Sequence, residues 1–101
     1  MKYFSDKEER YENIINLLCR YKGISTEKLY SILKDEECRY VLFLLLKKYN
    51  CVDLDNLKRD FSIYSTRKVN YNIRKAQQKL FLNKKIRDMY FEAENVIEKT
   101  Y

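Results

Sequence analysis

The stretch "DLDNLKRDFSIYSTRKVNYNIRKAQQKL", residues 53–80, predicts two helices joined by a tight turn. Asp53 is a suitable N-cap for a short first helix, whose apolar residues recur at spacings of three and four: Leu54, Leu57 and Phe61. The segment "SIY", residues 62–64, leaves room only for a short connection before Ser65, which can cap a longer second helix. This order of elements is typical of a helix-turn-helix, which we expect at about residues 53–82.

The second of these helices has an apolar side and a strongly basic side. Its apolar residues fall within one narrow sector of a helical projection: Val69, Ile73, Ala76 and Leu80. The opposite sector collects Arg67, Lys68, Tyr71, Arg74, Lys75 and Gln78. Residues 61–80 hold five basic residues and no acidic one. Lysines and arginines that only solubilise a surface helix are one interpretation, but solvated faces usually mix both signs, so this face favours a polyanion as its partner.

The basic block extends beyond this helix and then ends abruptly. The whole chain has 21 basic and 15 acidic residues, whereas Ser65 to Arg87 has eight basic and no acidic residues. Residues 88–101 return to four acidic residues against one basic residue. A block of basic residues confined to one stretch of the chain creates a positive patch, which attracts nucleic acid or an anionic surface.

Composition predicts an all-α fold for the remainder of the chain. The 101 residues include no proline and one glycine, and 46% of them are hydrophobic, so little interrupts long helices. This length suits one domain with a small core. We therefore expect a single helical domain over residues 1–101, a compact bundle of five to six helices.

Local signals place the other helices. A first helix can open at Ser5, with Glu8 at capping-box spacing, and run to Tyr21 before Gly23 stops it. Ser25 can cap a short second helix. Asp35 can cap the third, "CRYVLFLLLKKY", which is apolar around nearly its whole circumference and so belongs at the centre of the domain.

After the basic helix, Asn83 can end or bend the chain before a sixth, amphipathic helix. The apolar residues that we expect on its inner face are Ile86, Met89, Tyr90, Ala93 and Ile97.

Several functional classes are disfavoured. Histidine is absent, and so are a Gly-rich phosphate loop and a Gly-x-Ser-x-Gly elbow, so we expect a binding protein rather than an enzyme. Cys19, Cys38 and Cys51 are odd in number and widely spaced, which predicts buried reduced thiols, with no metal site and no cofactor. The N-terminus lacks the apolar stretch of a signal peptide, and the longest apolar run, Val41–Leu46, is too short to span a bilayer. We therefore expect a cytoplasmic protein with no membrane partner.

From about Ile14 to Ile97, the sequence resembles the C-terminal duplex-DNA-binding domain of the bacterial replication initiator DnaA, within the Trp-repressor-like group. The stretch "KGISTEKL" is similar to that family's entry into its second helix, and "CRYVLFLLLKKYNCVDLDNLKRDF" is similar to its central helix and first helix-turn-helix element. Arg39 stands where the family has an arginine at the beginning of its central helix.

The resemblance implies a DNA-contacting role for the start of the basic helix. The family has Asp-His-Thr-Thr-Val there, contacting bases and backbone, and the matching residues here are Ser65, Thr66, Arg67, Lys68 and Val69. Only the valine is identical, and Ser62 and Ile63 replace the family's paired turn glycines. The family's arginine-rich loop before its central helix is replaced by "KDEE", Lys34 to Glu37, so recognition of the family's own target sequence is not implied.

Together these features predict a free-standing reader of double-stranded DNA, a small regulator or accessory replication factor. On its helix, Arg67, Lys68 and Tyr71 would meet base edges. Lys75 and Lys79 would more readily touch phosphate. The full set of residues that we expect to contact DNA is Arg39, Ser65, Thr66, Arg67, Lys68, Tyr71, Arg74, Lys75, Gln78 and Lys79.

Two other functional hypotheses stay open at this point. Ten tyrosines would suit a protein-interaction module or inhibitor without DNA binding, with a protein partner or a homodimer, although AT-rich coding bias would also enrich tyrosine. A helix lying on a membrane surface is disfavoured, because the domain needs the apolar side of the basic helix for its own core. DNA binding and protein interaction can be distinguished by two features. These are the exposure of Arg67, Tyr71 and Arg74, and whether carboxylates lie beside them.

Overall fold

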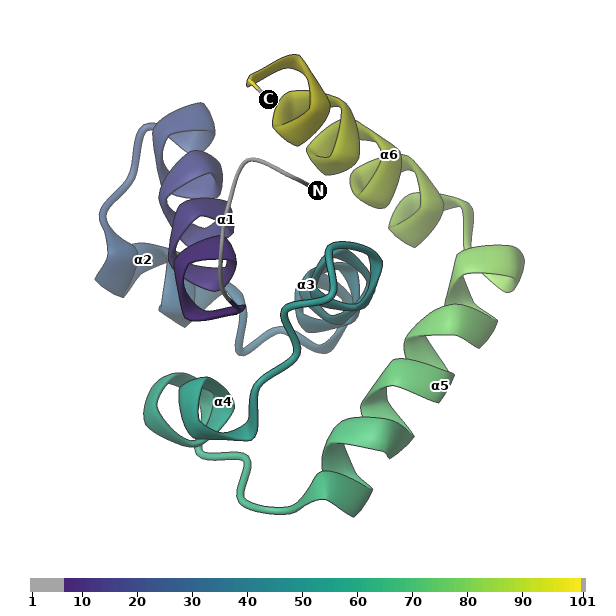
Figure 1. Ribbon diagram of the computed structural model, residues 1–101. Coiled ribbons are helices and arrows are strands. Elements are labelled where there is room, and N and C mark those ends of the chain that lie inside the picture. Colours follow the sequence, from purple (N-terminus) through teal and green to yellow (C-terminus); the bar gives the residue numbers. More distant parts are fainter. Residues whose placement is uncertain (1–6, 101) are drawn as a thin grey trace.

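The computed structural model describes residues 7–100, and six helices occupy most of them (Figure 1). They are α1 (Lys7–Lys22), α2 (Thr26–Ile32), α3 (Glu36–Lys48), α4 (Leu54–Phe61), α5 (Thr66–Leu82) and α6 (Lys84–Thr100). No strand occurs within the described range, so the prediction of an all-α fold is confirmed. The proposed capping box at Ser5 falls on a residue outside that range.

The predicted caps are confirmed at four helices. Ser25 and Ser65 each accept a backbone N–H from the residue three positions later, at 3.2 and 3.0 Å. Asp35 accepts the Cys38 N–H at 3.2 Å, and Asp53 accepts the Asp55 N–H at 3.0 Å. These side chains satisfy backbone donors that a helix leaves unpaired in its first turn, which explains where the helices begin.

α3 forms the centre of the core. All of Val41–Leu46 is buried, as expected for a helix that is apolar around its circumference. Figure 1 shows α3 surrounded by the other helices, with α1 and α2 on one side of it and α5 on the other. α6 contacts α1, α3 and α5. The basic helix is therefore held against the most apolar element of the domain.

The amphipathic patterns of the outer helices largely match their burial. Val69, Ile73 and Ala76 of α5 are buried, as are Ile86, Tyr90 and Ile97 of α6. Other residues that the pattern placed inside are only half-buried at the edge of the core: Leu54, Phe61, Leu80, Met89 and Ala93. Cys19 and Cys51 are buried thiols, whereas Cys38 is half-buried, which corrects the expectation for that residue.

Tyrosine hydroxyl groups join distant helices. Tyr11 of α1 and Tyr30 of α2 donate hydrogen bonds to the Asp60 carboxylate of α4, at 2.6 and 3.2 Å. Tyr49, at the end of α3, donates to Glu98 of α6 at 2.7 Å. These contacts fix α4 against α1 and α2, and α6 against α3. Much of the tyrosine content is therefore structural.

No helix within residues 7–100 is both long and apolar enough to cross a membrane.

Candidate functional site

The connection between α4 and α5, residues 62–65, fixes the direction in which α5 leaves the core. Ser62 adopts a left-handed conformation, with φ of 56°, and donates its N–H to the Lys58 carbonyl at 3.2 Å. Ile63 donates its N–H to the Leu57 carbonyl at 3.2 Å, and its side chain is buried. The turn is therefore anchored by two backbone hydrogen bonds and one apolar contact with the core, without the glycines of the resembling family.

α5 presents two polar surfaces. Its outer face, which we define as Arg67, Arg74 and Gln78, is exposed to solvent. Its flank borders a groove of about 440 Å³ between α5, the first turns of α3 and the end of α4. The α5 residues that line this α3–α5 groove are Lys68, Tyr71, Asn72, Lys75 and Lys79. Tyr71 is 51% exposed and lies between the two surfaces.

The α3–α5 groove is strongly positive. Four of its lining side chains are cationic: Arg39, Lys68, Lys75 and Lys79. None of them forms an ion pair with any residue that the structure describes. The one carboxylate among the lining residues is Glu36, which accepts a hydrogen bond from the Tyr40 hydroxyl at 3.0 Å. An anion that enters the groove thus meets four cations and one carboxylate.

Burial raises the pKa of the Tyr40 hydroxyl, and its hydrogen bond to Glu36 adds to the increase. The phenol therefore stays neutral near pH 7 and adds no negative charge to the groove.

The structure gathers half of the predicted contact residues around this groove: Arg39, Lys68, Tyr71, Lys75 and Lys79. Arg67, Arg74 and Gln78 do not line it and are exposed on the outer face. Thr66 is exposed at the first position of α5, and Ser65 uses its hydroxyl oxygen to cap that helix. The predicted contact residues of α5 therefore lie on two adjacent surfaces of that helix.

Five residues that line the groove are outside the predicted contact set: Glu36, Tyr40, Phe61, Ile63 and Asn72. Asn72 is buried, and its side-chain amide donates to the Lys68 carbonyl at 2.8 Å. Its position beside the apolar sector of α5 is the signal that could have identified it as a residue of the groove wall. Glu36 could be recognised only from the packing of α3 against α5.

The acidic residues at the start of α3 make local structural contacts. Asp35 caps α3, and Glu37 forms an ion pair with Lys85 at 3.1 Å. Asn83 also donates to Glu37, at 3.4 Å, and its own side-chain oxygen accepts the Ile86 N–H at the start of α6. The segment thus begins one helix and holds the α5–α6 corner against it. Its carboxylates also stand where negative charge favours the start of a helix.

Within residues 7–100, no three or more cysteine, aspartate or glutamate side chains are arranged to hold a metal ion. No protein-family model, curated protein or solved structure matches the chain.

Proposed function

We propose that this protein binds duplex DNA, with α4 and α5 acting as a helix-turn-helix and α5 as its recognition helix. The observation that carries the proposal is the concentration of unpaired basic side chains on α5, a helix that contains no acidic residue. Lys48, Arg59, Lys84 and Lys85 each form an ion pair with a carboxylate, whereas no basic side chain of α5 pairs with a described residue. A concentrated, uncompensated positive surface is what a phosphate backbone attracts.

The two surfaces of α5 suggest a division of labour. Arg67 and Arg74 project from the outer face, where a recognition helix meets base edges in the major groove. Lys75 and Lys79 line the groove behind that face, where they would meet the sugar-phosphate backbone. Lys68 lines the same groove, so we assign it to phosphate contact. Base readout is left to Arg67 and Arg74 on the outer face, together with Tyr71 between the two surfaces.

The resemblance to the C-terminal domain of DnaA supports this proposal through the order of the elements. A buried central helix is followed by a short helix, a tight turn and a longer helix with a basic surface. The acidic segment before α3 differs from the family's arginine-rich loop and is occupied by internal contacts. We therefore propose a small regulator or accessory replication factor that uses α5 and Arg39, and has its own target sequence.

The test is fluorescence anisotropy with a labelled random-sequence duplex at several salt concentrations. Contacts to roughly four to six phosphates should give a slope of about −4 to −5 for log affinity against log salt. The double variant Lys75→Glu, Lys79→Glu should lose most of this binding. The matched control, Lys28→Glu with Lys47→Glu, changes charge equally at exposed positions that do not line the groove, and should retain most of the affinity. Absence of binding at low salt, including to an enriched random pool, would refute the proposal.

One observation favours a second candidate, a protein-interaction module. Phe81 and Leu82 at the end of α5 are 79% and 83% exposed, and Phe91 of α6 is also exposed. Large apolar side chains this exposed are often covered by a partner or by a second copy of the chain. Sedimentation of the wild-type chain and of Phe81→Ser, Leu82→Ser tests the homodimer. A concentration-dependent dimer that the substitutions abolish would support it, and a monomer at all concentrations would exclude it.

A further inference from the structure

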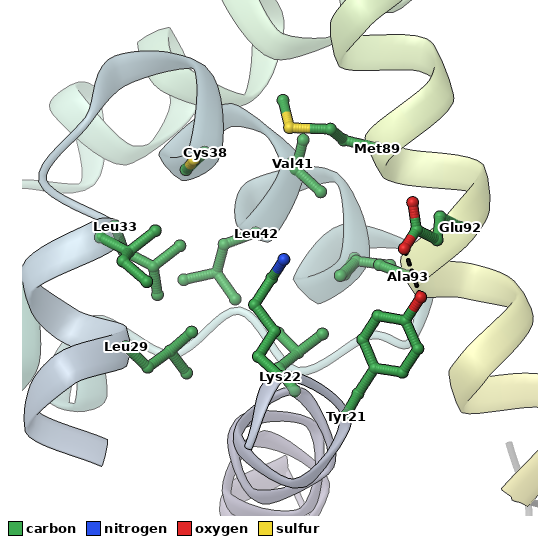
Figure 2. A pocket seen from close by; sticks show the side chains of 13 residues that line it. Tyr21, Lys22, Leu29, Leu33, Cys38, Val41, Leu42, Met89, Glu92 and Ala93 are labelled. Carbon is green, nitrogen blue, oxygen red and sulfur yellow. Dashed lines mark hydrogen bonds between the residues drawn. The ribbon is translucent and has the colours of Figure 1, made fainter. Parts of the chain in front are cut away.

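A second pocket lies on the other side of α3, among α1, α2, α3 and α6 (Figure 2). Its volume is about 150 Å³, and none of its lining residues belongs to α4 or α5. Its walls are mostly aliphatic, with Leu29, Leu33, Val41 and Leu42 among them. This site is therefore distinct from the α3–α5 groove in position and in character.

The charged groups that line this pocket are one cation, Lys22, and one carboxylate, Glu92. Figure 2 shows the Lys22 ammonium group pointing across the pocket, with Tyr21 and Glu92 beside each other at one edge. The Tyr21 hydroxyl donates a hydrogen bond to Glu92, which engages the one carboxylate among the described lining residues. Lys22 forms no ion pair with any described residue.

The remaining titratable group on the wall, Cys38, adds no second negative charge. Burial raises the pKa of the Cys38 thiol, and the nearby Asp35 carboxylate adds to the increase. Cys38 is therefore a neutral thiol near pH 7 and not a thiolate. The cation of this apolar pocket has no described ion-pair partner, whereas its carboxylate already accepts a hydrogen bond from Tyr21. The pocket therefore favours a ligand with an apolar body and one negative charge placed at Lys22.

We propose that this pocket binds a small monocarboxylate whose apolar body is about the size of a benzene ring, with its carboxylate at the Lys22 ammonium group. An apolar cavity of about 150 Å³ in another protein is large enough to hold benzene, which sets the size of the body. The aliphatic walls would bind that body by removing its surface from water. Lys22 supplies the preference for an acid over an alcohol or an amine.

Methionine-methyl NMR provides a direct test, because the sequence contains only Met1 and Met89, and Met89 lines the pocket. The probes are phenylacetate, 2-phenylethanol and 2-phenylethylammonium, which share a ring and differ in the charge of the polar end. Phenylacetate should shift the Met89 methyl signal saturably and leave the Met1 signal in place. It should bind roughly fivefold more tightly than the alcohol and at least about tenfold more tightly than the ammonium ion.

Two variants assign the contacts. Lys22→Gln should remove the preference for phenylacetate over 2-phenylethanol, whereas Lys28→Gln, an exposed lysine of α2 that does not line the pocket, should keep it. Ala93→Phe should fill the pocket and abolish the Met89 shift, with circular dichroism confirming that it remains folded. Because Lys22 is exposed, Lys22→Gln decides the question if Ala93→Phe does not fold.

Absence of a saturable Met89 shift with phenylacetate would overturn the proposal. Equal affinities for the acid and the alcohol in the wild type would also overturn it, as would equal behaviour of Lys22→Gln and Lys28→Gln. None of these measurements contains DNA, so the result is independent of the proposed DNA-binding function.

Discussion

Charged side chains have partners at the junction of α1, α2 and α4, whereas the basic side chains of α5 have no described carboxylate partner. At the junction, the Asp60 carboxylate accepts hydrogen bonds from Tyr11, Tyr30 and Arg59, and Arg59 also pairs with Glu12 at 2.9 Å. Along α5, every basic side chain lacks a described carboxylate partner. Charge is used at the junction to fix one helix against two others. On α5 it remains available to a partner.

The two regions also differ in how their charges affect the stability of the folded chain. Clustered like charges repel one another, so the α3–α5 groove destabilises the folded chain until an anion arrives. The junction works in the opposite sense, because hydrogen bonds to a charged group are among the stronger ones in proteins. Substitutions at the junction should therefore change stability, and substitutions on α5 should change binding.

The largest expected effect is the loss of the junction carboxylate. The Asp60 side chain is only 8% exposed, so Asp60→Ala leaves two tyrosine hydroxyls and a guanidinium without their acceptor. We expect the free energy of unfolding, measured by urea denaturation, to fall by about 3 kcal/mol. Asp88→Ala is the control, because it breaks an exposed ion pair with Lys84 and should cost under about 0.5 kcal/mol. Equal losses in the two variants would contradict the role given to the junction.

Acid should weaken the same junction. Burial acts to raise the pKa of Asp60, but hydrogen bonds from Arg59 and Tyr11 outweigh it and lower that pKa below its ordinary value. A lowered pKa contributes stability that is complete above the pKa of about 3.9 in an unfolded chain. The contribution is lost as pH falls through the lower folded value.

Asparagine has no carboxyl group to titrate, so Asp60→Asn lacks this pH-dependent contribution to stability. The difference in unfolding free energy between wild type and Asp60→Asn should therefore be largest near neutral pH and should shrink in acid. Urea denaturation of both chains across that range measures it. A difference that stays constant with pH would show that Asp60 contributes through packing alone.

The sequence predicted those features that depend on neighbours in the chain. Caps such as Ser65 and Asp53 act on backbone groups two or three residues away, so their side chains and spacing suffice to identify them. The central position of α3 followed from an apolar run with no polar face. The existence of a basic side on α5 followed from a charge block confined to a few turns.

Features that depend on packing between distant segments could not be predicted in this way. Tyr11 meets Asp60 across 49 positions of sequence, so no local pattern distinguishes this structural tyrosine from an interface tyrosine. The separation of Lys68 from Arg67 depends on where α3 lies against α5, and a helical projection shows only one broad basic sector. The apolar pocket beside Lys22 likewise requires four helices in place.

The two surfaces of α5 can be separated by single substitutions. Arg67→Ala should lower the preference for the best DNA site by roughly 1–3 kcal/mol if Arg67 reads a guanine. Lys75→Ala should weaken all duplexes about equally, by roughly fivefold, and reduce the salt slope by about one. Competition binding with a selected site and a random duplex measures both effects. Both variants should unfold at the wild-type urea concentration, because neither side chain has a described carboxylate partner.

Identical competition profiles for Arg67→Ala and Lys75→Ala would show that the outer face and the groove act as one surface. A clear loss of stability in either variant would instead place that residue with the junction.

The smallest expected effect concerns Glu36 and Glu37, adjacent carboxylates in the first turn of α3. Glu36 lines the α3–α5 groove, whereas Glu37 does not line it and pairs with Lys85. Either charge near the start of a helix stabilises it by a few tenths of a kcal/mol. Only Glu36 also lines the groove that we propose for phosphate contact, where a carboxylate and a phosphate would repel each other weakly through water.

Glu36→Gln and Glu37→Gln therefore form a matched pair, with the same loss of charge in the same helical turn. Both should lower the free energy of unfolding by up to about 0.5 kcal/mol, through the helix dipole and their individual contacts. Glu36→Gln alone should tighten binding to a random duplex, by about twofold at low salt and less at high salt, since screening weakens the repulsion that the substitution removes. Anisotropy titrations at two salt concentrations resolve this difference. Equal tightening in both variants would mean that net charge, and not the lining of the groove, controls the approach of DNA.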